Sequence, residues 1–185
     1  MNTITTAAAA AIIAQGEKSA FNKVEIVEFV AGLVEGVLLE NHLSEFNTCF
    51  KDVEYDGAQM FDAVTLFAKK DLTDIMSALT HIGNVFLSMP KDLIDCTHVA
   101  SNLQRIEAWA TPFKNPKEAL PLIWTNLLTN YVAMIHNLDT MNTKFAAHDI
   151  QGAGVSAALI LELGLGPISV AEEAKDIEEI KPTHW

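Results

Sequence analysis

Two glycines four residues apart, inside a segment that otherwise favours a helix, constrain this fold more than any other feature. The segment is VEFVAGLVEGVLLE, residues 27–40, and the glycines are Gly32 and Gly36. An interior glycine destabilises a helix by about 0.5–1 kcal/mol relative to alanine. Residues four apart share a helix face, so this face lacks side chains and lets a second backbone approach closely enough to gain dispersion contacts. We therefore expect a close helix crossing here.

A second segment, GAGVSAALILELG at residues 152–164, repeats the pattern with Gly154 and Ala158. Small residues four apart are also typical of seams between chains and of membrane helix dimers. The pattern predicts crowded packing for both helices and leaves open whether the partner lies in the same chain.

The rest of the chain predicts an all-α protein, because apolar residues recur at three- and four-residue spacing and no segment alternates as a strand would. We expect a compact bundle of about seven helices in residues 17–168. A short N-terminal helix is expected at 1–16 before the bundle, because the alanine-rich start favours helix formation. A signal peptide is not expected there, because the segment lacks a basic region. An acidic, solvated tail at 169–185 should follow it.

Several residues indicate where helices begin and end. Asn22, Asp71 and Asn115 are expected N-caps, and Pro116 after Asn115 suits a first helical position. Pro90 is expected to end the helix that begins after Asp71, with the next helix starting at about Lys91.

Half of the residues are hydrophobic and 19% are charged, whereas about a quarter is usual. Ala119–Leu138, expected as one helix, carries no charged residue, and Ala153–Leu165 carries only Glu162. This surplus of apolar surface favours a non-enzymatic structural or assembly subunit that packs helix faces against copies of itself or other proteins. Trp185, at the end of the chain, is a candidate contact with such a partner.

Two alternatives stay open. A membrane-associated subunit is suggested by Ala153–Ala171, which is long enough to cross a bilayer but is interrupted by Glu162 and by the GLGP sequence from Gly164. A binding protein for an apolar small molecule or lipid is suggested by aromatic residues that could line a cavity between helices. These are Phe61, Phe67, Phe86, Trp109, Trp124 and Tyr131.

Other classes are disfavoured. The net charge of −12 repels nucleic acid. The six histidines show no metal-ligand spacing, and no P-loop, nucleotide fingerprint or nucleophile motif occurs. We therefore predict no enzyme activity, no cofactor and no metal site. Cys49 and Cys96 are equally compatible with a disulfide and with two buried thiols, so the compartment stays undetermined.

Residues 28–166 resemble a loose pattern in uncharacterised helical proteins of ciliates and related protists. The resemblance is carried by FVAGLVEGVLLEN, then Cys49, then ALTHIGNVFLSMPKDLIDC ending at Cys96, then the glycine-containing last helix. In that pattern a helix with the positions of Phe29, Gly32 and Gly36 precedes two spaced cysteines. The resemblance implies an all-α fold and a Cys49–Cys96 pair, and it implies no activity.

Overall fold

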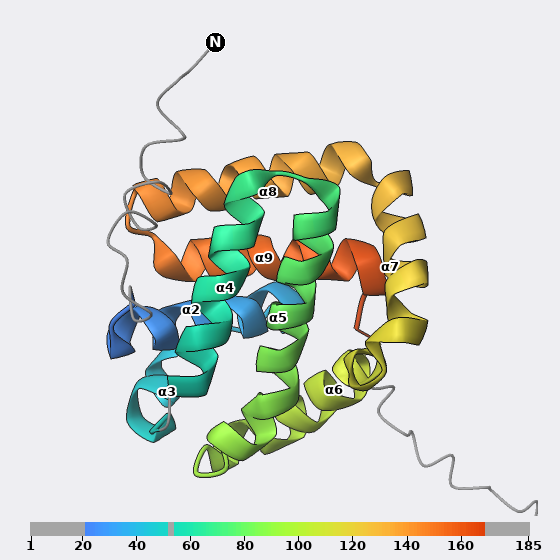
Figure 1. Cartoon of the computed structure of the whole chain (residues 1–185). Helices are drawn as coiled ribbons and strands as arrows, with labels where there is room; N and C mark the ends of the chain where they lie inside the picture. Colours follow the sequence, from blue (N-terminus) through green and yellow to red (C-terminus); the bar gives the residue numbers. More distant parts are fainter. Residues whose placement is uncertain (1–20, 52–53, 169–185) are drawn as a thin grey trace, which may run out of the picture.

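The computed structural model of the protein describes residues 21–51 and 54–168. Within these ranges the regular structure is helical and contains no strand, which confirms the all-α prediction. Eight α-helices and two short 3₁₀ segments occur in this part of the chain, in the labels of Figure 1. They are α2 (Lys23–Leu38), α3 (Leu43–Cys49), α4 (Glu54–Lys69), α5 (Leu72–Asp92), η1 (Thr97–Val99), α6 (Ala100–Ala110), η2 (Thr111–Lys114), α7 (Pro116–Thr129), α8 (Tyr131–Ala146) and α9 (Ile150–Leu165).

The helices form two crossing groups. α9 lies between α2 and α8, and these three run roughly along one direction (Figure 1). α4 and α5 form an antiparallel pair that crosses in front of them, while α6 and α7 close one end (Figure 1). Helices that meet on several sides bury a common core. Its largest fully buried side chains include Phe29, Phe46, Phe67 and Phe86.

The α2–α9 pair makes the most extensive interhelical contact among the described residues. A Cβ on Gly32 would overlap the carbonyl oxygen of Gln151, and one on Gly154 would overlap that of Phe29. A Cβ on Gly36 would lie 2.6 Å from the Cβ of Ala158. The structure thus brings the four small residues of the sequence analysis together at one crossing within the chain, where only backbone fits between the helices.

Two of the expected helix caps are confirmed. Asn22 and Glu25 form a capping box, in which the Glu25 N–H donates to Oδ1 of Asn22 at 3.1 Å and the Asn22 N–H donates to Glu25 at 2.8 Å. Asp71 accepts from the Thr73 N–H at 2.9 Å. Asn115 stands at the predicted N-cap position before Pro116, but the expected side-chain cap is wrong, because its side chain caps nothing and its backbone carbonyl accepts from Glu118 and Ala119.

The predicted boundary at Pro90 is also wrong. α5 continues through Pro90 to Asp92, and α6 begins only at Ala100, after η1. Pro90 lies in the last turn of α5 and has no N–H to donate to the Phe86 carbonyl, and the helix ends two residues later instead of at the proline. The apolar spacing from Leu93 to Ile106 was real, since these side chains are buried, but three-residue spacing also suits 3₁₀ turns.

The uncharged segment Ala119–Leu138 is not one helix. The chain turns at Asn130, between α7 and α8, which explains why eight α-helices stand where about seven were expected. Side chains bond to backbone carbonyls four residues earlier in the turns that lead up to the break: Thr125 to Pro121, Thr129 to Thr125, and Asn130 to Asn126. Such bonds compete with regular helix bonding, and no glycine or proline marks this turn.

Candidate functional site

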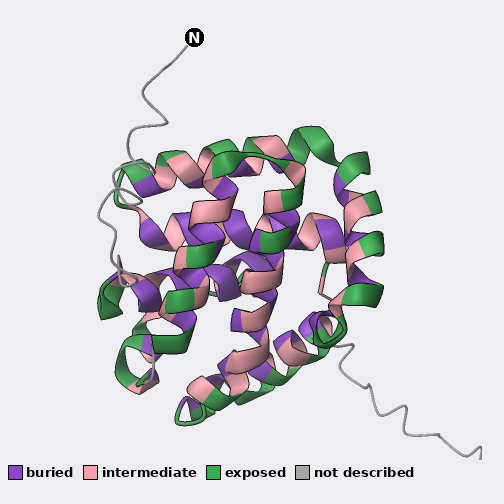
Figure 2. Ribbon diagram, in the orientation of Figure 1, coloured by how far each residue is buried: buried purple, intermediate pink, exposed green. Residues whose placement is uncertain are grey.

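The turn between α7 and α8 carries an exposed apolar surface, which we call the α7–α8 corner. It consists of Leu122, Leu128, Tyr131 and Val132, whose exposed fractions are 59%, 46%, 47% and 83%. The outer edges of α7 and of the start of α8 are exposed in Figure 2. Between these side chains lie neutral residues such as Thr125 and Thr129, and no charged residue occurs from 119 to 138. Residues 119–138 therefore contribute only apolar and neutral side chains to the corner, and Glu118 of α7, four residues before Leu122, lies at its edge.

The other large exposed apolar side chains in the described ranges have different surroundings. They are Val24, Leu39, Tyr55 and Ile94. Each has at least one acidic neighbour in the sequence, such as Glu40 after Leu39 or Asp95 after Ile94. Scattered apolar side chains among charges are ordinary on a protein surface, whereas a grouped and uncharged set suggests contact with a partner.

The second charge-poor segment, Ala153–Leu165, behaves differently. It belongs to α9, where every residue is buried or half-buried, and its apolar surface is used inside the chain (Figure 2). No helix in residues 21–51 and 54–168 is long and apolar enough to cross a membrane. Of the two segments on which the assembly prediction depended, only Ala119–Leu138 offers surface to a partner.

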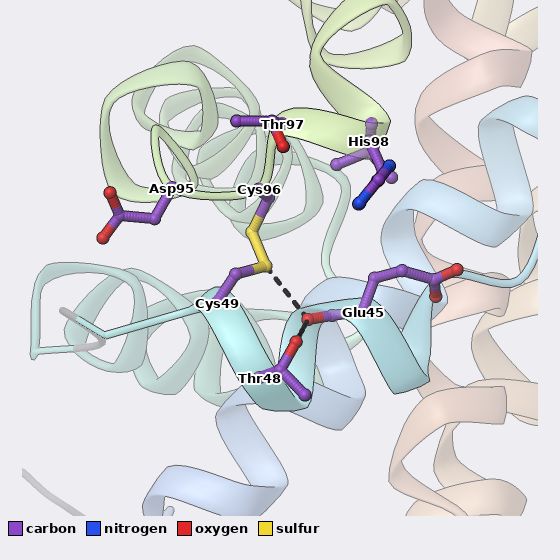
Figure 3. A pocket seen from close by; sticks show the side chains of 8 residues that line it. Glu45, Thr48, Cys49, Asp95, Cys96, Thr97 and His98 are labelled. Atoms are coloured by element: carbon purple, nitrogen blue, oxygen red, sulfur yellow. Dashed lines mark hydrogen bonds between the residues drawn. A yellow bond between two sulfur atoms is a disulfide. The ribbon is translucent and has the colours of Figure 1, made fainter.

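A disulfide joins Cys49, the last residue of α3, to Cys96, just before η1. Figure 3 shows it beside a cleft of about 100 Å³ lined by Glu45, Thr48, Asp95, Thr97 and His98. Sγ of Cys49 lies 3.0 Å from the carbonyl oxygen of Glu45. Because a disulfide sulfur carries no hydrogen, this is a contact and not a donated bond. Thr48 Oγ1 donates to the same oxygen at 2.7 Å.

The cleft gathers a histidine, carboxylates and both cysteines, which are the side chains of cysteine-based catalysis. Their state speaks against that chemistry, because a thiolate is the required nucleophile and both sulfurs are in the disulfide. The pKa of the Glu45 carboxyl is lowered by a backbone hydrogen bond and by the Ser44 hydroxyl, with smaller help from His42 and His98. Glu45 therefore stays ionised as an anion at neutral pH. A disulfide closing a loop of this length typically stabilises a fold by about 2–4 kcal/mol.

A third feature is a groove of about 450 Å³ beside α8 and α9, lined among others by Asn137, Leu159 and Glu162. Burial raises the pKa of the Glu162 carboxyl. The aromatic residues proposed above as a cavity lining do not line this groove or the disulfide cleft, and Phe67 and Phe86 are fully buried in the core. Neither of these two clefts is therefore the aromatic-lined cavity that the apolar-ligand hypothesis predicts.

Some predictions fall outside the described residues: Trp185, the N-terminal helix and the acidic tail. Within the described ranges, no three His, Cys, Asp or Glu side chains gather as a metal-binding group. Of the residues of the α7–α8 corner, the sequence analysis named only Tyr131, and it named it as a cavity-lining aromatic and not as a contact with a partner. The available signal was the run of twenty uncharged positions (138 − 119 + 1) that mixes leucines with threonines and asparagines.

Fold and site together define a compact helical protein with one internal disulfide, a glycine-packed central pair and an uncharged outer corner. A comparison with family models then places it: residues 10–164 match the model of the SctB-like family, described as secreted protein B-like. The match covers most of the chain, so the protein belongs to this family. No curated protein and no solved structure matches it. The resemblance to helical proteins of ciliates and related protists stays a prediction.

Proposed function

We propose that this protein is a secreted, non-enzymatic helical subunit that associates with a second copy of itself through the α7–α8 corner. The observation that carries the proposal is the exposure of Leu122, Leu128, Tyr131 and Val132 on a surface without charge. The family description supports secretion. The Cys49–Cys96 disulfide agrees with it, because such bonds persist in oxidising compartments.

Charge restricts where a second copy can bind. Two chains of net charge −12 repel each other, and an interface that buried their carboxylates would also cost desolvation. The corner lets two copies meet without burying a charge from residues 119–138. Symmetric pairing would place the same apolar side chains on both sides of the contact, as two-fold interfaces do.

Tyr131 and Leu122 suit the centre of such a contact. Tyrosine is enriched at interfaces because it offers a large apolar ring and a hydroxyl that keeps a polar partner. Thr125 and Thr129 would lie at the margin, where their hydroxyls already donate to backbone carbonyls and need no new partner. The corner can therefore lose water without leaving these two groups unsatisfied.

The test is the mass of the full chain in solution, measured by native mass spectrometry and by light scattering over a range of concentrations. We expect a concentration-dependent dimer for the unchanged protein. The double variant Leu122→Asp, Val132→Asp should be monomeric, because it places acids on both sides of the two-fold contact. Ile94→Asp is the matched control, since Ile94 is 76% exposed and lies away from the corner in the sequence; it should still dimerise.

A monomer at all concentrations, or an equal effect of both variants, would contradict the proposal. Retention of a lipid or other apolar molecule in the native spectrum would instead favour the ligand-binding alternative. Release only by detergent would favour membrane association. Both alternatives stay predictions.

A further inference from the structure

A polar cleft of about 390 Å³ lies between α4 and α5, apart from the corner and from the disulfide cleft. It is lined by Tyr55 from the first turn of α4 and by Asn84, Leu87, Ser88, Lys91 and Asp92 from the second half of α5. The two helices run antiparallel, so the cleft lies at the end of the pair away from their connecting turn (Figure 1). It has both an apolar wall and a set of polar groups.

Several polar groups at the cleft have already donated their hydrogens to the protein. The Ser88 hydroxyl donates to Oδ1 of Asp56 at 2.7 Å and also lies 2.9 Å from the Val85 carbonyl. An amide hydrogen of Asn84 goes to Oε1 of Gln59 at 3.1 Å. These bonds leave oxygen lone pairs as the groups that Ser88 can still offer to a ligand.

Two carboxylates, at the cleft or directly behind it, add further hydrogen-bond acceptors. Asp92 lines the cleft, and its Oδ2 is shielded from water with no hydrogen-bond partner among the described residues. Asp56, only 1% exposed, lies behind Ser88. Burial, with the charges of Asp56 and Asp92, raises the pKa of the Tyr55 hydroxyl, so both acids act on the same space. Among the described residues no ion pair joins Asp92 to the Lys91 ammonium that lines the same cleft, so the Asp92 carboxylate can still attract a cation that enters it.

We infer that this cleft binds an organic ammonium group, such as a primary amine on a short aliphatic chain. An ammonium carries only donors and a positive charge, which suits acceptors from Ser88 and Asp92. The Tyr55 ring, half exposed, offers a face for a cation, and Leu87 can contact the methylene chain. Lys91 is a tethered ammonium at the rim of the same cleft and would compete for Asp92. The inference does not depend on the proposed dimer.

The probe is cadaverine, and its neutral counterpart is the diol of the same chain length. Binding to the full chain is followed by NMR shifts of isotope-labelled protein. Cadaverine should produce saturable shifts centred on α4 and the end of α5, and the diol should not. Equal binding of the diol would overturn the inference and indicate a polyol site.

Three variants locate the effect. Asp92→Asn should weaken cadaverine binding by about tenfold or more, since it removes the charge of the pair. Lys91→Met should strengthen binding, because the competing ammonium is gone. Asp62→Asn removes one exposed acid elsewhere on α4 and should change nothing. Equal weakening by Asp62→Asn and Asp92→Asn would show non-specific attraction to an acidic surface and overturn the inference. Unchanged thermal unfolding of each variant excludes loss of the fold as the cause.

Discussion

α9 and the α7–α8 corner are both apolar and nearly free of charge, yet the first is enclosed and the second faces water. Their small residues explain the difference. α9 has Gly154 and Ala158 on the face toward α2, so two backbones meet and the surrounding apolar side chains are covered. The corner instead has large apolar side chains with Thr125, Thr129 and Asn130 exposed between them, and the chain turns there at Asn130. The low charge of a segment therefore does not decide whether that segment is buried or exposed. Its small residues do, because they decide whether another helix of the same chain can pack against it.

The largest expected effect comes from filling the α2–α9 crossing. Gly154→Val should destabilise the fold by about 4 kcal/mol, because the new atoms would meet backbone of Phe29, Gly32 and Leu33, which cannot rotate away. Ala133→Val, an equally β-branched product on the exposed start of α8, should change the free energy of unfolding by about 0.5 kcal/mol or less. Chemical denaturation of both variants measures the difference. Similar losses would show that the crossing is looser than described.

An effect of intermediate size on stability is expected from the hydrogen bond that joins α7 to α9. Asn126 of α7 donates through Nδ2 to the carbonyl of Gly164 in α9 at 2.7 Å. Asn126→Ala should cost about 1–2 kcal/mol, since the carbonyl of the buried Gly164 loses its partner. Thr125→Ala, one residue earlier and exposed, removes a bond within α7 only and should cost much less. A dimer that survives Asn126→Ala would show that the corner keeps its shape without this tie.

The smallest expected effect is on the pH dependence of the free energy of unfolding, to which Glu162 and Asp149, near the two ends of α9, contribute with opposite signs. Burial raises the pKa of Glu162, so the folded state binds this proton more readily than the unfolded chain. Stability should therefore fall as pH rises from the unfolded to the folded pKa, and Glu162→Gln should remove that fall. At Asp149, hydrogen bonds from Lys144 and from the Gly152 N–H lower the pKa. Its contribution is present above the unfolded pKa and is lost as pH falls through the folded pKa.

Urea unfolding at a series of pH values separates the two groups. Asp149→Asn should remove the loss on the acid side and leave the Glu162 effect in place. A Glu162→Gln variant with an unchanged pH profile would contradict the burial of this carboxyl.

The sequence predicted the helical class and much of its capping, because these depend on neighbours in the chain. Asn22 and Asp71 illustrate this: each cap bonds to an N–H two or three residues away. The turn at Asn130 was missed, since it depends on several side-chain bonds that are individually compatible with a helix.

Exposure was the other quantity that the sequence could not give. Ala119–Leu138 and Ala153–Leu165 look alike in charge, and only the packing of α9 against α2 and α8 separates them. The cleft at Asp92 had no sequence signal either. Its residues lie on two helices and share no spacing, so only the antiparallel pairing of α4 and α5 brings Tyr55 to Asp92.

The Cys49–Cys96 bond closes a covalent ring that contains all of α4 and α5. Both walls of the ammonium cleft, from Tyr55 to Asp92, lie inside that ring, whereas α2, α9 and the corner lie outside it. A single cleavage of the backbone between the two cysteines would therefore leave the two walls covalently linked through the disulfide. Reduction of the disulfide would open the ring, and side-chain packing alone would then hold residues 49 and 96 near each other.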